Sequence, residues 1–123
     1  MRKNKPKYLF IGLGTMGYSM SGHLSKDPNI DLYVFNRSNR VTKKWLKDFN
    51  GLEFKLSKDT KKKFNGLITC LKDDSSIVEV LIKNNFIGLL KSNAFVIDHS
   101  TTSLQLIQNI SSNKNEIINV IIS

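Results

Sequence analysis

Three glycines near the N-terminus have the spacing of a loop that binds phosphate groups. They form a G-x-G-x-x-G pattern over residues 12–17, which follows the apolar run 8–11 and opens a stretch with a helical apolar period over residues 16–24. In such a setting the first glycine allows a tight turn, the second lets the backbone approach a pyrophosphate, and the third lets the helix pack against the strand. The positive end of the helix would face the phosphates. The pattern predicts a dinucleotide site formed by Gly12, Leu13, Gly14, Thr15, Met16 and Gly17.

The residues that follow the second apolar run, 32–35, bear on which dinucleotide would bind. A cofactor with a free ribose 2′-hydroxyl usually meets Asp or Glu about 20 residues past the glycines. This chain has Asn36 there, followed by Arg37 and Ser38. A guanidinium can bind a 2′-phosphate through paired charge-assisted hydrogen bonds, whereas a carboxylate would repel it. We therefore expect NADP(H) to be preferred, with NAD(H) as the alternative. Arg40 could support Arg37 as a second cation. The alternative that Arg37 is an exposed arginine without a ligand role stays open.

Hydroxyl residues follow another apolar run, 94–97, near the C-terminus. Ser100 and Thr101 would lie at the carboxyl end of a parallel strand, where ligands bind in such sheets, and could orient a carboxylate. The same residues could equally cap a helix, and their types alone leave both interpretations open. One cysteine and two histidines are too few for a zinc ligand set, so no metal site is predicted.

Three segments match, in order and at suitable spacing, the motifs of one enzyme family. Residues 10–20 read FIGLGTMGYSM, residues 34–38 read VFNRS, and residues 97–103 read IDHSTTS. On these segments the chain resembles the β-hydroxyacid dehydrogenases, which include 3-hydroxyisobutyrate dehydrogenase and its glyoxylate and succinic semialdehyde reductase relatives. That family reads FIGLGxMGxxMAxNL, VYNRT and DxSTxSP at the corresponding places. The resemblance implies an NADP(H)-binding Rossmann domain in which residues 12–17 hold the pyrophosphate and residues 36–38 hold the adenosine ribose with its phosphate.

The resemblance also implies roles for four further residues. Leu71 and Lys72 would lie beside the cofactor, where the family usually has Leu-Pro, so Lys72 is a departure. Ser100 matches the serine that contacts substrate, and Thr101 its neighbour near the nicotinamide. The implied reaction is hydride transfer between the nicotinamide and a small β-hydroxyacid or aldehyde-acid.

The catalytic lysine of the family lies on a second, all-α domain that also forms most of the oligomer interface. The ending of this chain, residues 118–123, departs from the family's DAPVSGG segment. We expect residues 1–123 to form the NAD(P)-binding domain without the all-α domain, to be inactive alone, and to form a homo-oligomer only where that domain is present. No catalytic residue is assigned. A stand-alone, non-catalytic dinucleotide-binding module, or a basic interaction module, is the alternative.

The elements that must position these residues follow from alternating apolar and amphipathic stretches. Strands are expected at 8–11, 32–35, 52–56, 67–71, 94–97 and 117–122, and helices at 16–24, 39–49, 59–64, from 74 to 82, and from 102 to 110. Consecutive apolar residues suit strands that are buried on both faces. The alternation predicts a doubly wound parallel α/β sheet of the Rossmann type.

Composition limits the remaining classes of protein. The chain of 123 residues carries a net charge of +9, but its lysines are spread along the sequence and no RNA-binding motif with interleaved aromatics appears. We therefore expect small anionic ligands rather than nucleic acid. No apolar run approaches the ~20 residues of a membrane span. A single cysteine is consistent with a reducing, cytoplasmic location.

Overall fold

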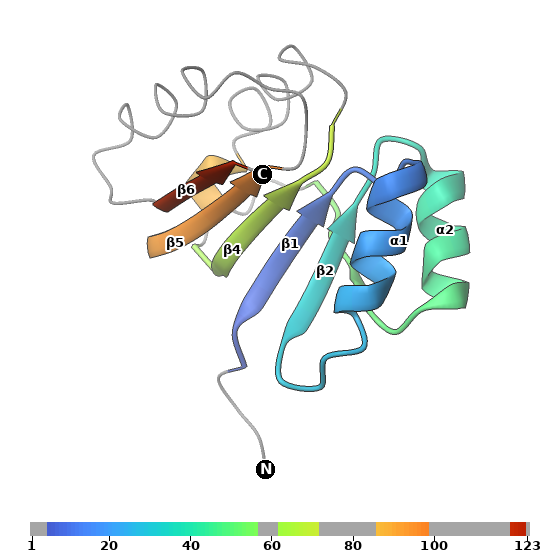
Figure 1. The fold of residues 1–123 in the computed structure, drawn as a ribbon, viewed down its shortest axis with the longest axis horizontal. Coiled ribbons are helices and arrows are strands. Elements are labelled where there is room, and N and C mark those ends of the chain that lie inside the picture. Colours follow the sequence, from blue (N-terminus) through green and yellow to red (C-terminus); the bar gives the residue numbers. More distant parts are fainter. Residues whose placement is uncertain (1–4, 57–61, 72–85, 99–118, 123) are drawn as a thin grey trace.

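One parallel sheet organises the computed structural model, which describes residues 5–56, 62–71, 86–98 and 119–122. In this part of the chain six strands pair in the order β3-β2-β1-β4-β5-β6. Figure 1 labels the run from β2 through β1, β4 and β5 to β6. Their bounds are Lys7–Ile11 (β1), Asp31–Phe35 (β2), Leu52–Glu53 (β3), Phe64–Thr69 (β4), Leu90–Asp98 (β5) and Asn119–Ile122 (β6). Every pairing is parallel. Because β1 and β4 are neighbours, the strand order reverses between them, and ligands bind at the carboxyl ends of strands at such a point.

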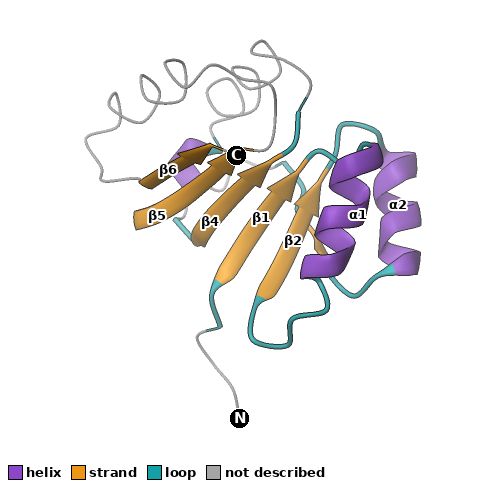
Figure 2. Ribbon diagram, viewed as in Figure 1, coloured by secondary structure: helices purple, strands orange, loops and turns teal. Residues whose placement is uncertain are grey.

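Two helices cover one face of the sheet next to β1 and β2. Helix α1 spans Thr15–Leu24 and α2 spans Asn39–Asp48, and both lie on the same side (Figure 2). Right-handed crossovers require this, since β1, β2 and β3 follow one another in one direction across the sheet. A 3-10 helix, η2, spans Ile87–Leu89 before β5. Among the described residues, no helix has the length and apolar character needed to span a bilayer.

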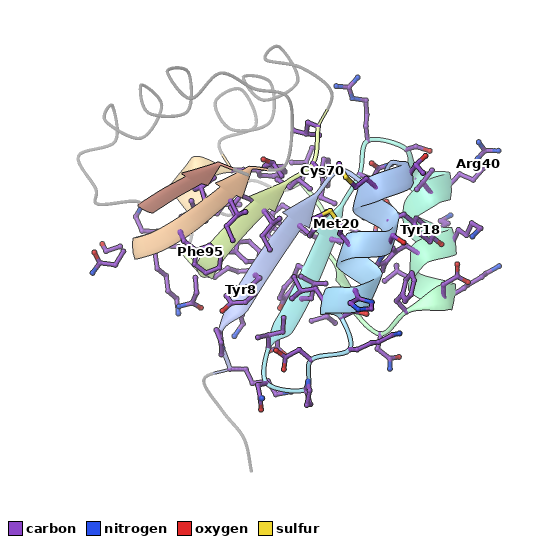
Figure 3. The ribbon with its side chains drawn as sticks, in the orientation of Figure 1. Tyr8, Tyr18, Met20, Arg40, Cys70 and Phe95 are labelled. Carbon is purple, nitrogen blue, oxygen red and sulfur yellow. The ribbon has the colours of Figure 1, made fainter. Side chains whose placement is uncertain are left out.

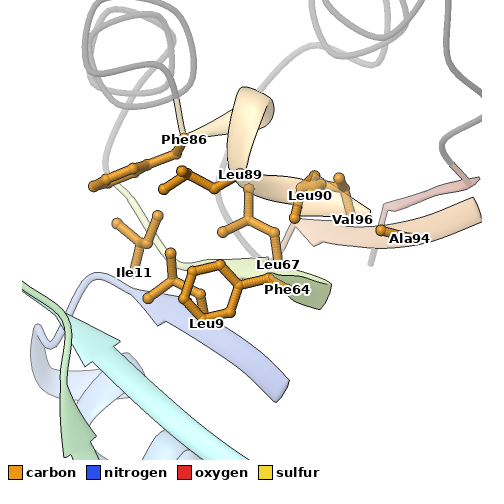
Figure 4. Close-up of a cluster of buried hydrophobic side chains, with 9 residues drawn as sticks. All are labelled: Leu9, Ile11, Phe64, Leu67, Phe86, Leu89, Leu90, Ala94 and Val96. Atoms are coloured by element: carbon orange, nitrogen blue, oxygen red, sulfur yellow. The ribbon is translucent and has the colours of Figure 1, made fainter. Parts of the chain in front are cut away.

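Both faces of the sheet are buried in apolar cores, as consecutive apolar residues predict. Leu9 and Ile11 point into one core, and Phe10 between them points into the other. The first core lies on the face opposite α1 and α2 (Figure 4); it consists of Leu9, Ile11, Phe64, Leu67, Phe86, Leu89, Leu90, Ala94 and Val96. The second lies under the helices and consists of Phe10, Leu13, Leu32, Val34, Trp45 and Ile68. The predicted doubly wound sheet is therefore confirmed.

The boundaries of β3, β4 and β5 differ from the sequence-based prediction by three residues or more. Strand β3 has two residues rather than five, and β4 begins at Phe64, which the prediction placed in a helix. Phe64 is fully buried and packs edge-to-face against the rings of Tyr33 and Phe54. This non-local packing draws Phe64 into the sheet despite the lysines before it. Strand β5 begins earlier than predicted and contains Asn93, which has a φ of 65°. The helices expected over 74–82 and 102–110 lie outside the described residues.

Candidate functional site

The glycine loop lies at the point where the strand order reverses. Its first residue, Gly12, donates a backbone hydrogen bond to the Phe35 carbonyl at 3.0 Å, and Cys70 donates one to the Ile11 carbonyl at 2.9 Å. The start of the loop is thus attached to the ends of both β2 and β4. Gly12 has a φ of +102°, and a Cβ there would overlap the Cys70 carbonyl. Only glycine fits this position, as the motif predicts.

The other two glycines of the loop have opposite surroundings. A Cβ at Gly17 would overlap the Gly12 carbonyl, so this glycine allows close packing of α1 against the loop. A Cβ at Gly14 would have no other protein atom within 4 Å, so this glycine borders open space. Gly14 is also the N-cap of α1, with no side-chain cap and no acidic residue in the first turn. The backbone N–H groups of that turn are therefore accessible to an anion.

Asn36 clamps the loop to the end of β2. The backbone N–H of Leu13 donates to Asn36 Oδ1 at 2.9 Å, and Asn36 Nδ2 donates to the Ser38 carbonyl at 3.4 Å. In the sequence, Asn36 was notable because it stands where an NAD-binding site usually has Asp or Glu. The structure adds a positioning contact, in which the amide supplies the acceptor that the loop needs without a negative charge.

A buried chain of hydrogen bonds connects α2 to the start of α1, next to the glycine loop. The Trp45 indole donates to Ser21 Oγ at 2.9 Å, and Ser21 Oγ donates to the Gly17 carbonyl at 2.6 Å. Trp45 and Ser21 are both fully buried, so the chain ties α2 to α1 beneath the last glycine of the motif. The motif analysis of the sequence gave no role to Ser21. A small hydroxyl four residues after Gly17, on the same helix face, is the signal that was available.

An open cleft of about 1140 Å³ runs along this edge of the sheet from the glycine loop to α2 and β3. Of the residues predicted from the sequence, the cleft brings together Gly12, Gly14, Asn36, Arg37, Ser38 and Leu71. Its other lining residues are Ile11, Phe35, Asn39, Thr42, Lys43, Glu53, Phe54, Lys55, Leu56 and Cys70. Such a cleft exceeds the ~300–1,000 Å³ typical of drug-sized ligands and has room for a dinucleotide half.

The remaining predicted residues lie in different places. Leu13 and Gly17 are buried beneath the loop, whereas Thr15 and Met16 are exposed on the first turn of α1. Lys72, Ser100 and Thr101 lie outside the described residues. Among the residues that are described, no group of His, Cys, Asp and Glu has the arrangement of a metal site.

The second cation of the cleft differs from the sequence-based expectation. Arg40 was expected to support Arg37, but it is absent from the described lining, and its side chain extends from α2 away from the sheet (Figure 3). Lys43 lines the cleft instead, on the same helix face as Asn39 and Thr42. The expectation for Arg40 rested on spacing alone, which does not say how the helix is rotated about its axis.

A polar cluster joins α1 to α2 away from the cleft. Tyr18 Oη donates to Asp48 Oδ2 at 2.6 Å, and Lys44 Nζ lies 3.1 Å from the same oxygen and 3.2 Å from Tyr18 Oη. Desolvation and the hydrogen bond to Asp48 raise the pKa of Tyr18. The hydrogen bonds from Tyr18 and Lys44 lower the pKa of Asp48, and the bond to Asp48 raises the pKa of Lys44. None of the three lines the cleft, so the cluster is a link between helices.

Comparisons of the sequence with known proteins agree with this geometry. The family model that describes the NAD-binding domain of 6-phosphogluconate dehydrogenase matches residues 7–121. An uncharacterised oxidoreductase of Shewanella frigidimarina is 30% identical over 105 residues, which are 85% of this chain and 36% of the relative. The chain therefore spans little more than a third of the length of that relative.

Solved structures share the fold at low sequence identity. The 3-hydroxyisobutyrate dehydrogenase of Mycobacterium tuberculosis, solved with L-serine, matches 95% of this chain with 39% of its own, at a TM-score of 0.77 and 16% identity. The 3-hydroxyisobutyrate dehydrogenase of Salmonella typhimurium matches 94% of this chain with 40% of its own, at 0.69 and 13%. TarJ of Staphylococcus aureus, in complex with NADPH, matches 99% with 38%, at 0.64 and 16%. These likenesses show a Rossmann-type α/β fold.

Proposed function

This chain belongs to the family of the NAD-binding domain of 6-phosphogluconate dehydrogenase, and on that premise we propose that it binds NADP(H) in the cleft. The observation that carries the proposal is the open surface at Gly14, at the uncapped start of α1 and in one cleft with Arg37. A pyrophosphate needs a close approach to backbone N–H groups, and Gly14 leaves that approach free. The residues present therefore fit a dinucleotide.

The individual roles in this proposal follow the course of the cleft. Gly12, Leu13, Gly14, Thr15, Met16 and Gly17 would hold the pyrophosphate through the backbone of the loop and the first turn of α1. Asn36, Arg37 and Ser38 would hold the adenosine ribose with its 2′-phosphate. Arg37 supplies a planar, permanently charged donor, and the neutral Asn36 amide does not repel the phosphate. Leu71, which lines the cleft beside Gly12, would lie along the cofactor.

The nicotinamide and substrate ends of the site rest on the family resemblance. Lys72 and Thr101 would lie by the cofactor, and Ser100 would orient the carboxylate of a small β-hydroxyacid or aldehyde-acid. When bound, NADP(H) supplies the donor or acceptor of hydride. We propose that the 123 residues form the cofactor-binding domain of such an oxidoreductase and that the proton transfer is performed by groups outside them. NADP(H) is supported further by TarJ, a structural neighbour solved with NADPH.

The proposal is tested by calorimetric titration of the chain with NADPH and NADH, for the wild type and for Arg37→Glu. The wild type is expected to bind NADPH more tightly than NADH, and Arg37→Glu should weaken NADPH binding by about 100-fold while NADH changes little, since a carboxylate would then face the 2′-phosphate. Equal losses for the two cofactors would exclude the 2′-phosphate role of Arg37. No binding of either cofactor by the wild type would refute the proposed function.

A further inference from the structure

Two lysines that belong to no sequence motif line the cleft. Lys43 lies on the second turn of α2, and Lys55 follows β3. The segment before Lys55 is anchored at the edge of the sheet, because Phe54 N donates to the Val34 carbonyl at 2.9 Å. Arg37, Lys43 and Lys55 thus reach one cleft from three separate segments, the loop after β2, helix α2 and the loop after β3.

The rotation of α2 about its axis places Lys43 toward the cleft. Thr42 is 2% exposed, and its Oγ1 donates to the Ser38 carbonyl at 3.3 Å, which holds the first turn of the helix in place. Asn39, at the start of the same face, lines the cleft together with Thr42 and Lys43. Residues three and four positions apart share a helix face, as Lys43 and Thr42 do with Asn39. Arg40 is absent from the described lining of the cleft, and its side chain extends from α2 away from the sheet (Figure 3).

The described lining of the cleft carries more positive than negative charge. Among the described lining residues, three cations and one carboxylate, Glu53, have a net charge of +2. A terminal phosphomonoester carries about −1.5 to −2 at neutral pH, so one guanidinium compensates only part of it. Within the described part of the chain, Lys43 and Lys55 make no ion pair, so their ammonium groups are available to a ligand.

We infer that Lys43, assisted by Lys55, determines specificity for a 2′-phosphomonoester on the adenosine ribose by binding the charge that Arg37 leaves uncompensated. The inference rests on the proposed function, because it names further residues of the same site. It differs from the expectation drawn from the sequence, in which the second cation was Arg40. The carboxylate of Glu53, in the same lining, would disfavour additional negative charge beyond the dianion.

The test uses ligands that contain only the adenosine half of the cofactor. Binding of 2′,5′-ADP and of AMP to the full chain is measured by calorimetry for the wild type, Lys43→Gln, Lys55→Gln and the matched control Arg40→Gln. Lys43→Gln should weaken binding of 2′,5′-ADP by about tenfold, Lys55→Gln by less, and Arg40→Gln by under about twofold, because Lys43 and Lys55 are in the described lining of the cleft and Arg40 is not. AMP should change little in all three variants. Thermal unfolding is measured for each variant to check that the chain remains folded.

The outcomes separate this inference from the proposed function. If the wild type binds NADPH but Lys43→Gln behaves like Arg40→Gln, the role of Lys43 is refuted and the proposed function stands. If Lys43→Gln weakens AMP as much as 2′,5′-ADP, the lysine acts on the 5′-phosphate, and the inferred specificity is also refuted. If the wild type binds neither NADPH nor NADH, both proposals fall. A selective loss of 2′,5′-ADP that diminishes in high salt supports the inference.

Discussion

The Leu13 backbone N–H lies 2.9 Å from Asn36 Oδ1, which joins the glycine loop directly to the end of β2. The two residues are 23 positions apart, yet one hydrogen bond connects the pyrophosphate end of the proposed site to its ribose end. In the proposed site, the Asn36 side chain would therefore have two functions. It holds the loop in place, and it keeps a negative charge away from the proposed 2′-phosphate position beside Arg37.

Two substitutions at Asn36 separate these functions. Asn36→Ala removes the acceptor and should lower the free energy of unfolding by about 1 kcal/mol and weaken both cofactors, because the loop loses its clamp. Asn36→Asp keeps an acceptor for Leu13 N–H and adds a charge, so NADPH affinity should fall while NADH affinity is retained or improved. Chemical denaturation and parallel titrations provide the measurements. A stable Asn36→Asp variant that still prefers NADPH would contradict the charge argument.

The open space at Gly14 predicts a variant that loses the ligand without losing stability. In Gly14→Ala the added methyl meets no other protein atom within 4 Å, so the melting temperature should stay within about 2 °C of the wild type. The methyl occupies the proposed approach of the pyrophosphate, so NADPH affinity should fall by at least about tenfold. Gly17→Ala is the contrasting variant, because its Cβ overlaps the Gly12 carbonyl and should destabilise the fold. Unchanged NADPH binding by Gly14→Ala would place the pyrophosphate elsewhere.

The hydrogen-bond chain beneath the loop predicts energetic coupling between α1 and α2. Trp45→Phe removes the indole donor to Ser21 and should cost about 1–3 kcal/mol, since Trp45 is fully buried. Ser21→Ala should cost about 1 kcal/mol. The double variant should cost less than the sum of the two, with a coupling of about 0.5–1 kcal/mol. Urea unfolding of the four proteins measures this cycle, and strictly additive losses would show that the bond contributes nothing.

The Tyr18–Asp48–Lys44 cluster predicts the direction of a pH dependence. Asp48 has a lowered pKa in the folded chain, so its contribution is present above the ordinary carboxyl pKa and is lost as the pH falls toward the lowered value. Tyr18 and Lys44 have raised pKa values, so their contribution is present at neutral pH and is lost at alkaline pH. The stability difference between wild type and Asp48→Asn should therefore shrink between pH 5 and pH 3. A difference that is constant over this range would exclude the ion pair as its cause.

The sequence by itself determined the local features of this protein. The glycine spacing, the apolar runs of β1 and β2 and the helical period of α1 depend on neighbouring residues, and each was predicted to within one or two positions. The family follows from the order of short motifs and is confirmed by the match over residues 7–121. The preference for NADP(H) and the role of each site residue stay predictions, which the titrations above address.

Only the tertiary structure decided features that depend on residues far apart in the chain. Phe64 joins β4 because the rings of Tyr33 and Phe54 surround it, although the lysines before it favour a helix. Lys43 rather than Arg40 lines the cleft, because packing of α2 sets the rotation of the helix. Local propensity cannot encode either result, since both are fixed by the free energy of non-local contacts that form only when the sheet and its helices come together.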